Sequence, residues 1–180
     1  MKTLIVVIHP NLNESVINKR WTRELTQYPE LYTVHNLYKT YPDGIIDVQK
    51  EQQLIELHDS IVLQFPLYWF NCPPLLKKWL DEVFTYGWAY GSTSGHKLKN
   101  RKFALAVSAG IKEADFVSGG RYQHSLKEIL LPFEMTAKYV EANYLPFYAF
   151  YDAESEVSQA QLDHSAKGYI DYLQSFSLMP

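Results

Sequence analysis

The chain has 180 residues, of which 47% are hydrophobic and 15% aromatic, so its length and apolar content suffice for one domain with a full core. Its net charge of −3 leaves no broad basic surface for nucleic acid, and its one cysteine, Cys72, excludes an internal disulfide and fits a reducing compartment. The longest nearly apolar stretch, residues 61–70, is about half of what a membrane-spanning helix needs. We therefore expect a cytoplasmic protein with a single domain over residues 1–180 and no nucleic-acid partner.

The first strand and helix frame a candidate anion site. Residues 3–8 form a continuous apolar run, residues 9–13 are turn-forming, and Ser15 can cap the helix that follows. The face that this helix would bury consists of Ile17, Trp21 and Leu25. The helix start offers unpaired N–H groups and a positive dipole end, while His9 and Asn18 add side-chain donors. The pattern favours a phosphate held by a serine-led turn, although a plain helix cap also explains Ser15, and the glycine motifs of dinucleotide and P-loop sites are absent from the sequence.

The middle of the chain predicts two further strands and two helices. Residues 31–37 are typical of a second strand, and Asp47 can cap a helix that runs to residue 58. Residues 60–65 predict a third strand that is buried on both faces. Pro74 opens a helix with the apolar positions Leu75, Leu76, Trp79, Leu80, Val83 and Phe84.

Three aromatic residues follow the third predicted strand, which Pro66 ends. Tyr68, Trp69 and Phe70 lie at the carboxyl end of this strand, where open α/β sheets bind their ligands. They are therefore candidate walls of a pocket for a flat aromatic ligand. The alternative is that these rings belong to the core or to an interface.

The second half of the chain continues the alternation. Residues 103–107 predict a fourth strand, residues 125–141 a helix that Pro132 interrupts, residues 143–150 a last strand and residues 156–176 a terminal helix. This order implies an α/β fold with a doubly wound parallel sheet of five strands, helices on both faces and ligands at the carboxyl edge.

Three loops then converge on that edge: residues 9–18, 66–73 and 108–120. In the third, Gly110 lets the backbone approach a ring closely and donate N–H groups to it, although a plain turn glycine is the alternative. A phosphate end, an aromatic wall and a backbone-lined edge together describe flavin mononucleotide (FMN).

Four groups of residues carry a resemblance that covers nearly the whole chain. They are His9-Pro10 with Ser15 and Asn18; residues 66–70 with 73–77; Gly87-Trp88-Ala89-Tyr90-Gly91; and residues 131–134 with Ala137. With these, the chain resembles the flavodoxin-like NAD(P)H:quinone oxidoreductases, and especially their short bacterial members, which include the ancillary quinone reductases of glutathione-gated potassium efflux systems.

The resemblance implies a bound flavin, FMN with FAD as the alternative, and a ping-pong exchange in which NAD(P)H gives hydride and a quinone or similar flat acceptor takes it. It also implies a homodimer with sites at the subunit boundary. The residues that would hold the phosphate and ribityl chain are His9, Ser15, Val16, Ile17 and Asn18. The residues that would hold the isoalloxazine ring are Pro66, Leu67, Tyr68, Trp69, Phe70, Ser108, Ala109, Gly110 and Ile111.

Two departures from the family pattern concern residues that are expected to bind the flavin ring or to take part in catalysis. Ser108-Ala109-Gly110-Ile111 replaces the usual Thr-Thr-Gly-Gly, so one close backbone approach is lost. Phe116 stands at the position of the family's tyrosine and has no hydroxyl, which leaves Tyr122 and His124 as the candidate catalytic residues near the histidine position. The six histidines have no metal-ligand spacing, so we expect no metal site.

An aromatic patch predicts the assembly of the chain. Its residues are Val83, Phe84, Tyr86, Trp88 and Tyr90, and they present more apolar surface than a monomer of this size readily covers, so a symmetric dimer is expected.

Other functions also remain. A one-electron flavodoxin carrier shares the fold but not the phosphate loop, and a receiver domain needs acidic residues where His9-Pro10 stands. The main alternative is an FMN-binding regulatory subunit that docks on a membrane transport system and has little catalytic role.

Overall fold

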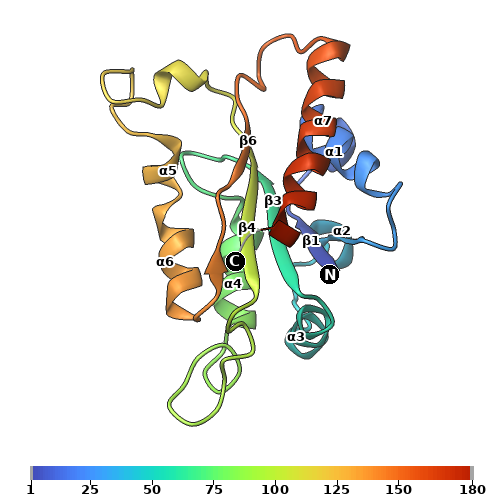
Figure 1. The fold of residues 1–180 in the computed structure, drawn as a ribbon, viewed down its shortest axis with the longest axis vertical. Helices are drawn as coiled ribbons and strands as arrows, with labels where there is room; N and C mark the ends of the chain where they lie inside the picture. The colour runs from blue at the N-terminus through green and yellow to red at the C-terminus, as the bar shows by residue number, and fades with distance from the viewer. Residues whose placement is uncertain (1, 179–180) are drawn as a thin grey trace.

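The computed structural model describes residues 2–178 and contains one parallel sheet (Figure 1). The strand order is β2-β1-β3-β4-β5, and β6 also pairs with β4. The strands are β1 (Thr3–Val7), β2 (Tyr32–Asn36), β3 (Ser60–Pro66), β4 (Lys102–Ser108), β5 (Asn143–Tyr144) and β6 (Tyr148–Phe150). The doubly wound, flavodoxin-like topology that the sequence predicts is therefore confirmed, with the last sheet position shared by two short strands.

The helices connect successive strands. They are α1 (Ile17–Leu25), α2 (Leu37–Thr40), α3 (Val48–Glu56), α4 (Pro74–Val83), α5 (Leu126–Ile129), α6 (Leu131–Tyr139) and α7 (Gln159–Gln174). Three short 3₁₀ helices are η1 (Leu12–Glu14), η2 (Glu113–Asp115) and η3 (Ser175–Leu178). Asp47 caps α3 as predicted, because its Oδ1 accepts the backbone N–H of Lys50 at 3.1 Å.

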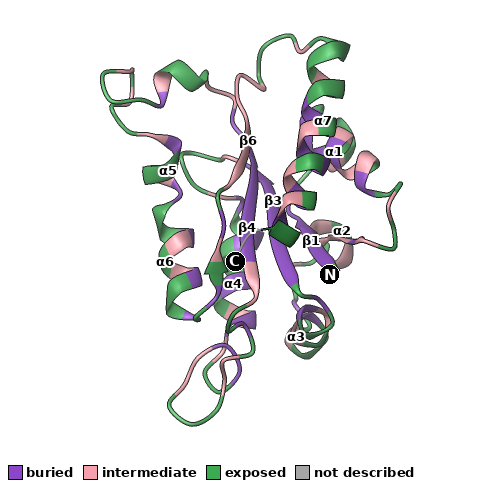
Figure 2. Ribbon diagram, viewed as in Figure 1, coloured by how far each residue is buried: buried purple, intermediate pink, exposed green. Residues whose placement is uncertain are grey.

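Alternate residues of the central strands enter two separate cores, one on each face of the sheet. Ile5, Val7 and Val62 pack with α1 and α7, whereas Val6, Leu63 and Leu105 pack with α3, α4 and α6. In Figure 1, α6 and α7 accordingly lie on opposite sides of the sheet. Figure 2 shows the central strands buried between these layers.

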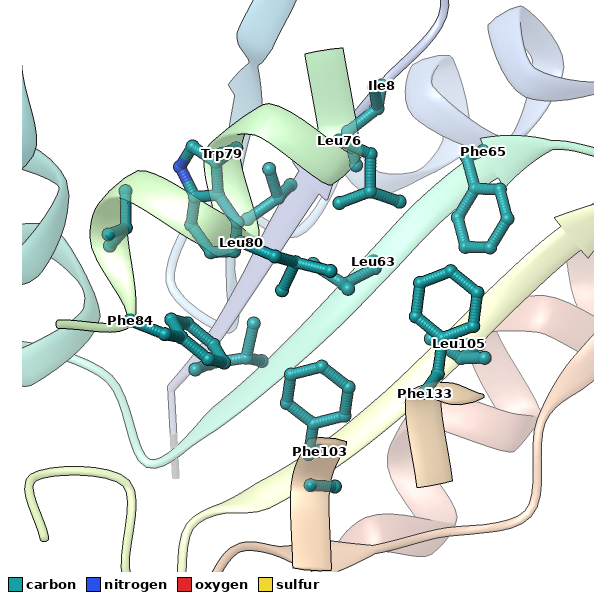
Figure 3. Packing of buried hydrophobic residues seen from close by; sticks show 14 of the residues in the cluster. Ile8, Leu63, Phe65, Leu76, Trp79, Leu80, Phe84, Phe103, Leu105 and Phe133 are labelled. Atoms are coloured by element: carbon teal, nitrogen blue, oxygen red, sulfur yellow. The ribbon is translucent and has the colours of Figure 1, made fainter. Parts of the chain in front are cut away.

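Helix α4 anchors the second core. All six apolar positions predicted for it are buried, and Trp79 has no exposed surface. Leu76, Leu80 and Phe84 extend from α4 toward the rings of Phe103 and Phe133 (Figure 3). Because Pro74 occupies the first turn, where a missing N–H costs nothing, α4 begins directly after the loop that leaves β3.

A buried carboxylate connects the elements on this face. Glu51 of α3 is 1% exposed and accepts the Tyr41 hydroxyl at 2.7 Å and Trp79 Nε1–H at 2.8 Å, while His35 Nε2 lies 2.9 Å from its Oε1. Burial by itself would raise the pKa of this carboxyl, but the interactions with His35, Tyr41 and Trp79 outweigh it and leave the pKa below its ordinary value. Glu51 therefore links α3 to β2, to the segment after α2 and to α4.

Two predicted elements in the second half of the chain, a helix and a strand, contain a proline, and the two predictions have different outcomes. The interruption at Pro132 is confirmed, because α5 ends at Ile129 and Pro132 lies in the first turn of α6. The continuous last strand over residues 143–150 is wrong. Pro146 has no N–H for the ladder, and the chain leaves the sheet between β5 and β6. Within residues 2–178, no helix is long and apolar enough to cross a membrane.

Candidate flavin site

The loop after β1 prepares the start of α1 as an anion site. Ser15 Oγ, two residues before α1, accepts the backbone N–H of Asn18, the second residue of α1, at 3.1 Å. This is the bond to a residue three positions on that a capping serine makes. The N–H groups of Val16 and Ile17 have no hydrogen-bond partner among the described residues, and Val16 is 51% exposed. Two donors and the positive end of the α1 dipole are thus left for an anion.

His9 adds a side-chain donor to this loop. Its Nδ1 accepts the backbone N–H of Asn11 at 3.1 Å, so the neutral ring carries its proton on Nε2. Burial lowers the pKa of His9, which favours this neutral form at physiological pH. His9 therefore presents an N–H donor rather than a positive charge.

Asn18 connects this loop to the two neighbouring strands. Its side chain is 1% exposed, and Nδ2 donates to Ser108 Oγ at the end of β4 at 2.8 Å. Gln64 Nε2, at the end of β3, donates to the backbone oxygen of Asn18 at 3.1 Å. The Asn18 amide is thus directed at Ser108, and the expected phosphate donor is a buried link between loops.

The aromatic loop after β3 is a tight turn. Tyr68 and Asn71 exchange both backbone hydrogen bonds at 2.9 Å, and the two residues between them, Trp69 and Phe70, have positive φ angles of 48° and 59°. Positive φ at both central positions is the geometry of a type I′ turn, which normally needs glycine or asparagine. A bulky residue there is strained, and such strain concentrates at functional sites. The turn leaves Trp69 95% exposed, so the interpretation of Trp69 as ordinary core is wrong.

The loop after β4 is packed against the C-terminal half of the chain. Ala109 donates its N–H to Phe150 O at 2.8 Å and is fully buried, whereas the N–H groups of Gly110 and Ile111 have no partner among the described residues. A Cβ on Gly110 would lie 2.5 Å from Cδ of Glu154. Glu154 is exposed and its side chain can move aside, so this contact alone does not require glycine at position 110. Two N–H donors, rather than the expected run of four residues, are left for a ligand edge.

Only one of the two catalytic candidates lies at the aromatic turn. The ring of Tyr122 meets Phe70 edge-on with 4.9 Å between centroids and also contacts the buried Phe116 at 5.9 Å. The His124 side chain is 67% exposed, and its nearest charged neighbour is Glu128 at 3.9 Å, beside the capping box that starts α5. The structure thus brings Tyr122, and not His124, to the predicted ligand wall.

The chain matches a family described as having a flavodoxin-like fold over residues 1–173. It belongs to this family. A solved flavodoxin-like structure, general stress protein 14 of Treponema denticola in complex with FMN, is 51% identical, has a TM-score of 0.92 and pairs 97% of this chain with 99% of that chain. The NADPH-quinone reductase of P. pentosaceus is 31% identical with a TM-score of 0.86, over 96% of this chain and 98% of that chain.

Two curated relatives of this flavodoxin-like protein extend the comparison. The uncharacterized NAD(P)H oxidoreductase YrkL of Bacillus subtilis is 47% identical over 97% of this chain and 99% of the relative. The glutathione-regulated potassium-efflux system ancillary protein KefG of Yersinia pestis is 37% identical over 97% of this chain and 94% of the relative. The family that the sequence resembles is therefore confirmed.

A cavity lies beside the three loops rather than between them. It has a volume of about 650 Å³ and is bounded by Leu80 and Phe84 of α4 and by Phe133 and Tyr139 of α6, reaching the aromatic turn only at Asn71 and Cys72. Among residues 2–178, no group of three His, Cys, Asp or Glu side chains is arranged to hold a metal ion.

Sequence reasoning missed several residues that shape this site. Gln64 was the one amide in an apolar strand run, and this polar interruption was a usable signal. Glu154 gave no such signal, because its contact with Gly110 crosses from the segment after β6 to the loop after β4.

Proposed function

We propose that this protein is an FMN-dependent NAD(P)H:quinone oxidoreductase. The observation that carries the proposal is the 51% identity and TM-score of 0.92 to a structure that contains FMN. The names of YrkL and of the NADPH-quinone reductase support the nicotinamide nucleotide and the quinone. FAD is the alternative flavin.

The residues present fit FMN. The free N–H groups of Val16 and Ile17, with His9 beside them, suit a phosphate at the start of α1. The free N–H groups of Gly110 and Ile111 suit the carbonyl edge of the isoalloxazine ring. Ser15 and Asn18 position these loops, the first by capping α1 and the second by binding Ser108.

The chemistry that bound FMN supplies is two-electron hydride exchange, first with NAD(P)H and then, in ping-pong order, with a quinone or similar flat acceptor. The protein contributes position and electrostatics. With FMN bound, the N–H groups of Gly110 and Ile111 would stabilise negative charge on the ring edge, and Trp69 and Phe70 would shield from water the face where the two substrates alternate. Pro66, Leu67 and Tyr68 fix the turn, because Leu67 N–H binds Ser108 O at 2.8 Å. Tyr122 is the proposed proton donor, ahead of the exposed His124.

The proposed assembly is a homodimer in the cytoplasm, but the surface differs from the predicted patch. Val83, Phe84 and Trp88 are buried within the chain, so only Tyr86 of that patch is broadly exposed. A different stripe is open on α6, where one face carries Leu131, Met135 and Tyr139, which are 47%, 57% and 68% exposed. This apolar stripe borders the cavity between α4 and α6 and supports pairing with a second copy.

A second function is favoured by the 37% identity to KefG, a potassium-efflux ancillary protein. In that case the chain binds FMN and docks on a membrane transport system with little catalytic role. The two functions make different demands on Trp69 and Phe70, because only the enzyme needs substrates to reach the flavin face.

Stopped-flow spectroscopy of the purified protein tests the proposal. The enzyme predicts bound yellow FMN that is bleached by NADPH or NADH and recovers its colour on mixing with a benzoquinone. Bound FMN that neither nucleotide bleaches would overturn the oxidoreductase proposal and favour the regulatory subunit, which a pull-down from solubilised membranes then checks. Protein without flavin affinity would contradict both functions.

A further inference from the structure

Arg121 is a cation held at the rim of the aromatic turn. Its guanidinium carbon lies 5.5 Å from the ring centroid of Tyr122, and that ring also meets Phe70 at 4.9 Å and Phe116 at 5.9 Å. The side chains thus form a row from the predicted ligand wall outward: Phe70, Tyr122, Arg121. A guanidinium that rests on an aromatic face keeps its charge and its planar donors while losing part of its side-chain freedom before any ligand arrives.

The charge of Arg121 is not used by the fold. Among the described residues, no carboxylate lies within ion-pair distance of Arg121 and no acceptor takes a hydrogen bond from it. Arg20, by contrast, pairs with Glu24 and Asp163, and Arg101 donates to three backbone oxygens. The nearby acidic segment η2 (Glu113–Asp115) contacts this loop through the backbone, because Tyr122 N–H binds Asp115 O at 3.2 Å.

The position of Arg121 selects among the phosphates of a nicotinamide nucleotide. The nicotinamide must stack near Trp69 and Phe70, and the ring of Tyr122 then separates this place from the guanidinium. The FMN phosphate belongs at the start of α1, on another loop. The charges that remain are the diphosphate, which NADPH and NADH share, and the 2′-phosphate on the adenosine end of NADPH. The 2′-phosphate is commonly bound by arginine.

Resting on the proposed function, we propose that Arg121 binds the adenosine 2′-phosphate and makes NADPH the preferred reductant over NADH. The flat rings of Tyr122 and Phe70 direct the nucleotide toward the flavin, and Arg121 distinguishes the two nucleotides by a group that only NADPH carries. The preference therefore resides in the loop between η2 and α5, outside the flavin loops.

The test compares Arg121→Gln with Arg23→Gln, which changes another exposed arginine, on helix α1, whose side chain has no ion pair or hydrogen bond within residues 2–178. Isothermal titration measures binding of 2′,5′-ADP and of 5′-ADP to the FMN-loaded protein. Stopped-flow measures flavin reduction by NADPH and by NADH. We expect Arg121→Gln to weaken the binding of 2′,5′-ADP and to lower the rate constant of flavin reduction by NADPH, each by about ten- to hundredfold. The affinity for 5′-ADP, the rate constant with NADH and the affinity for FMN should not change. Arg121→Lys should give values between those of the wild type and Arg121→Gln, and Arg23→Gln should match the wild type.

Each contrary result has a separate meaning. Equal losses for NADPH and NADH would place Arg121 on the diphosphate and overturn the preference. Weaker FMN binding in Arg121→Gln would place the guanidinium on the flavin instead and also overturn it. Wild-type protein that binds 2′,5′-ADP no better than 5′-ADP would overturn it without any turnover measurement. A wild-type flavin that neither nucleotide reduces would contradict the proposed function, while the titration still decides the role of Arg121.

Discussion

Asn18 Nδ2 donates to Ser108 Oγ at 2.8 Å across 90 positions of sequence, and this buried bond joins the first turn of α1 to the end of β4. Gln64 extends the link to β3 through its bond to the Asn18 backbone oxygen. The three strand ends that carry the candidate site are therefore held in register by amides and a hydroxyl below the ligand surface. Such a link positions the loops without itself touching a ligand.

Replacing Asn18 by alanine should destabilise the fold and weaken flavin binding together. The change leaves Ser108 Oγ without its buried donor, whereas Gln64 Nε2 keeps the backbone oxygen of residue 18 and the Thr22 hydroxyl. The free energy of unfolding should therefore fall by about 1 to 3 kcal/mol. Urea unfolding measures the loss, and fluorescence quenching of FMN measures affinity. Asn13→Ala, an exposed change in the same loop, is the control. An Asn18→Ala protein as stable as the control would show that the bond contributes nothing.

Trp69 should contribute little to stability and much to turnover. Because it is 95% exposed at positive φ, Trp69→Gly relieves strain and should change the free energy of unfolding by less than about 1 kcal/mol. Trp79→Ala, in the core, should cost about 3 to 5 kcal/mol. Thermal unfolding compares the two, and stopped-flow should show slower flavin reduction in Trp69→Gly. A large stability loss in Trp69→Gly would contradict the turn geometry.

Glu51 should make the fold acid-sensitive. The pKa of its carboxyl is lower in the folded chain than in the unfolded chain, so its contribution is complete above the unfolded pKa of about 4.3 and is lost as pH falls through the folded pKa. Glu51→Gln should therefore unfold more easily at pH 7, by about 1 to 3 kcal/mol, with a difference that shrinks below about pH 4. Urea unfolding over pH 3–7 checks this, with the exposed Glu156→Gln as control. A constant difference across that range would exclude the ionised carboxylate as its cause.

The apolar stripe of α6 should form the dimer contact. Met135→Glu places a charge in the middle of this stripe and should shift the protein to monomer at micromolar concentration. Equilibrium sedimentation measures the mass of the wild type, of Met135→Glu and of Lys127→Glu, which lies on the exposed surface of α5. A monomeric wild type, or equal dissociation in both variants, would remove α6 from the interface.

The sequence determined the fold where strong local signals coincide. Pro66, Pro74 and Pro132 each mark a boundary that the structure keeps, because a missing N–H restricts where proline can lie. Pro146 carried the same signal and was overlooked within an apolar run, so one predicted strand became two. Periodicity also located the buried face of α4. It did not predict the burial of Trp88, which depends on a loop that returns to Glu56, and there Trp88 Nε1–H donates to Glu56 Oε1 at 2.7 Å.

The candidate site was predictable as three loops but not in its details. Parallel topology alone places the segments after β1, β3 and β4 at one edge of the sheet, which is where the loops of residues 9–18, 66–73 and 108–120 were predicted. Trp69 and Phe70 adopt the left-handed backbone conformation, which bulky residues rarely adopt, so their local sequence could not predict it. The contact of Gly110 with Glu154 depends on distant packing and was equally out of reach.

The unusual position of Trp69 also gives the protein an optical reporter. Trp21 and Trp79 have no exposed surface and Trp88 is 9% exposed, so Trp69 is the one indole of the four in the chain that meets solvent broadly. A collisional quencher such as iodide would act selectively on its emission. Protection of that emission by a bound nucleotide, quinone or partner chain would then reveal what covers the aromatic turn, without any label added to the protein.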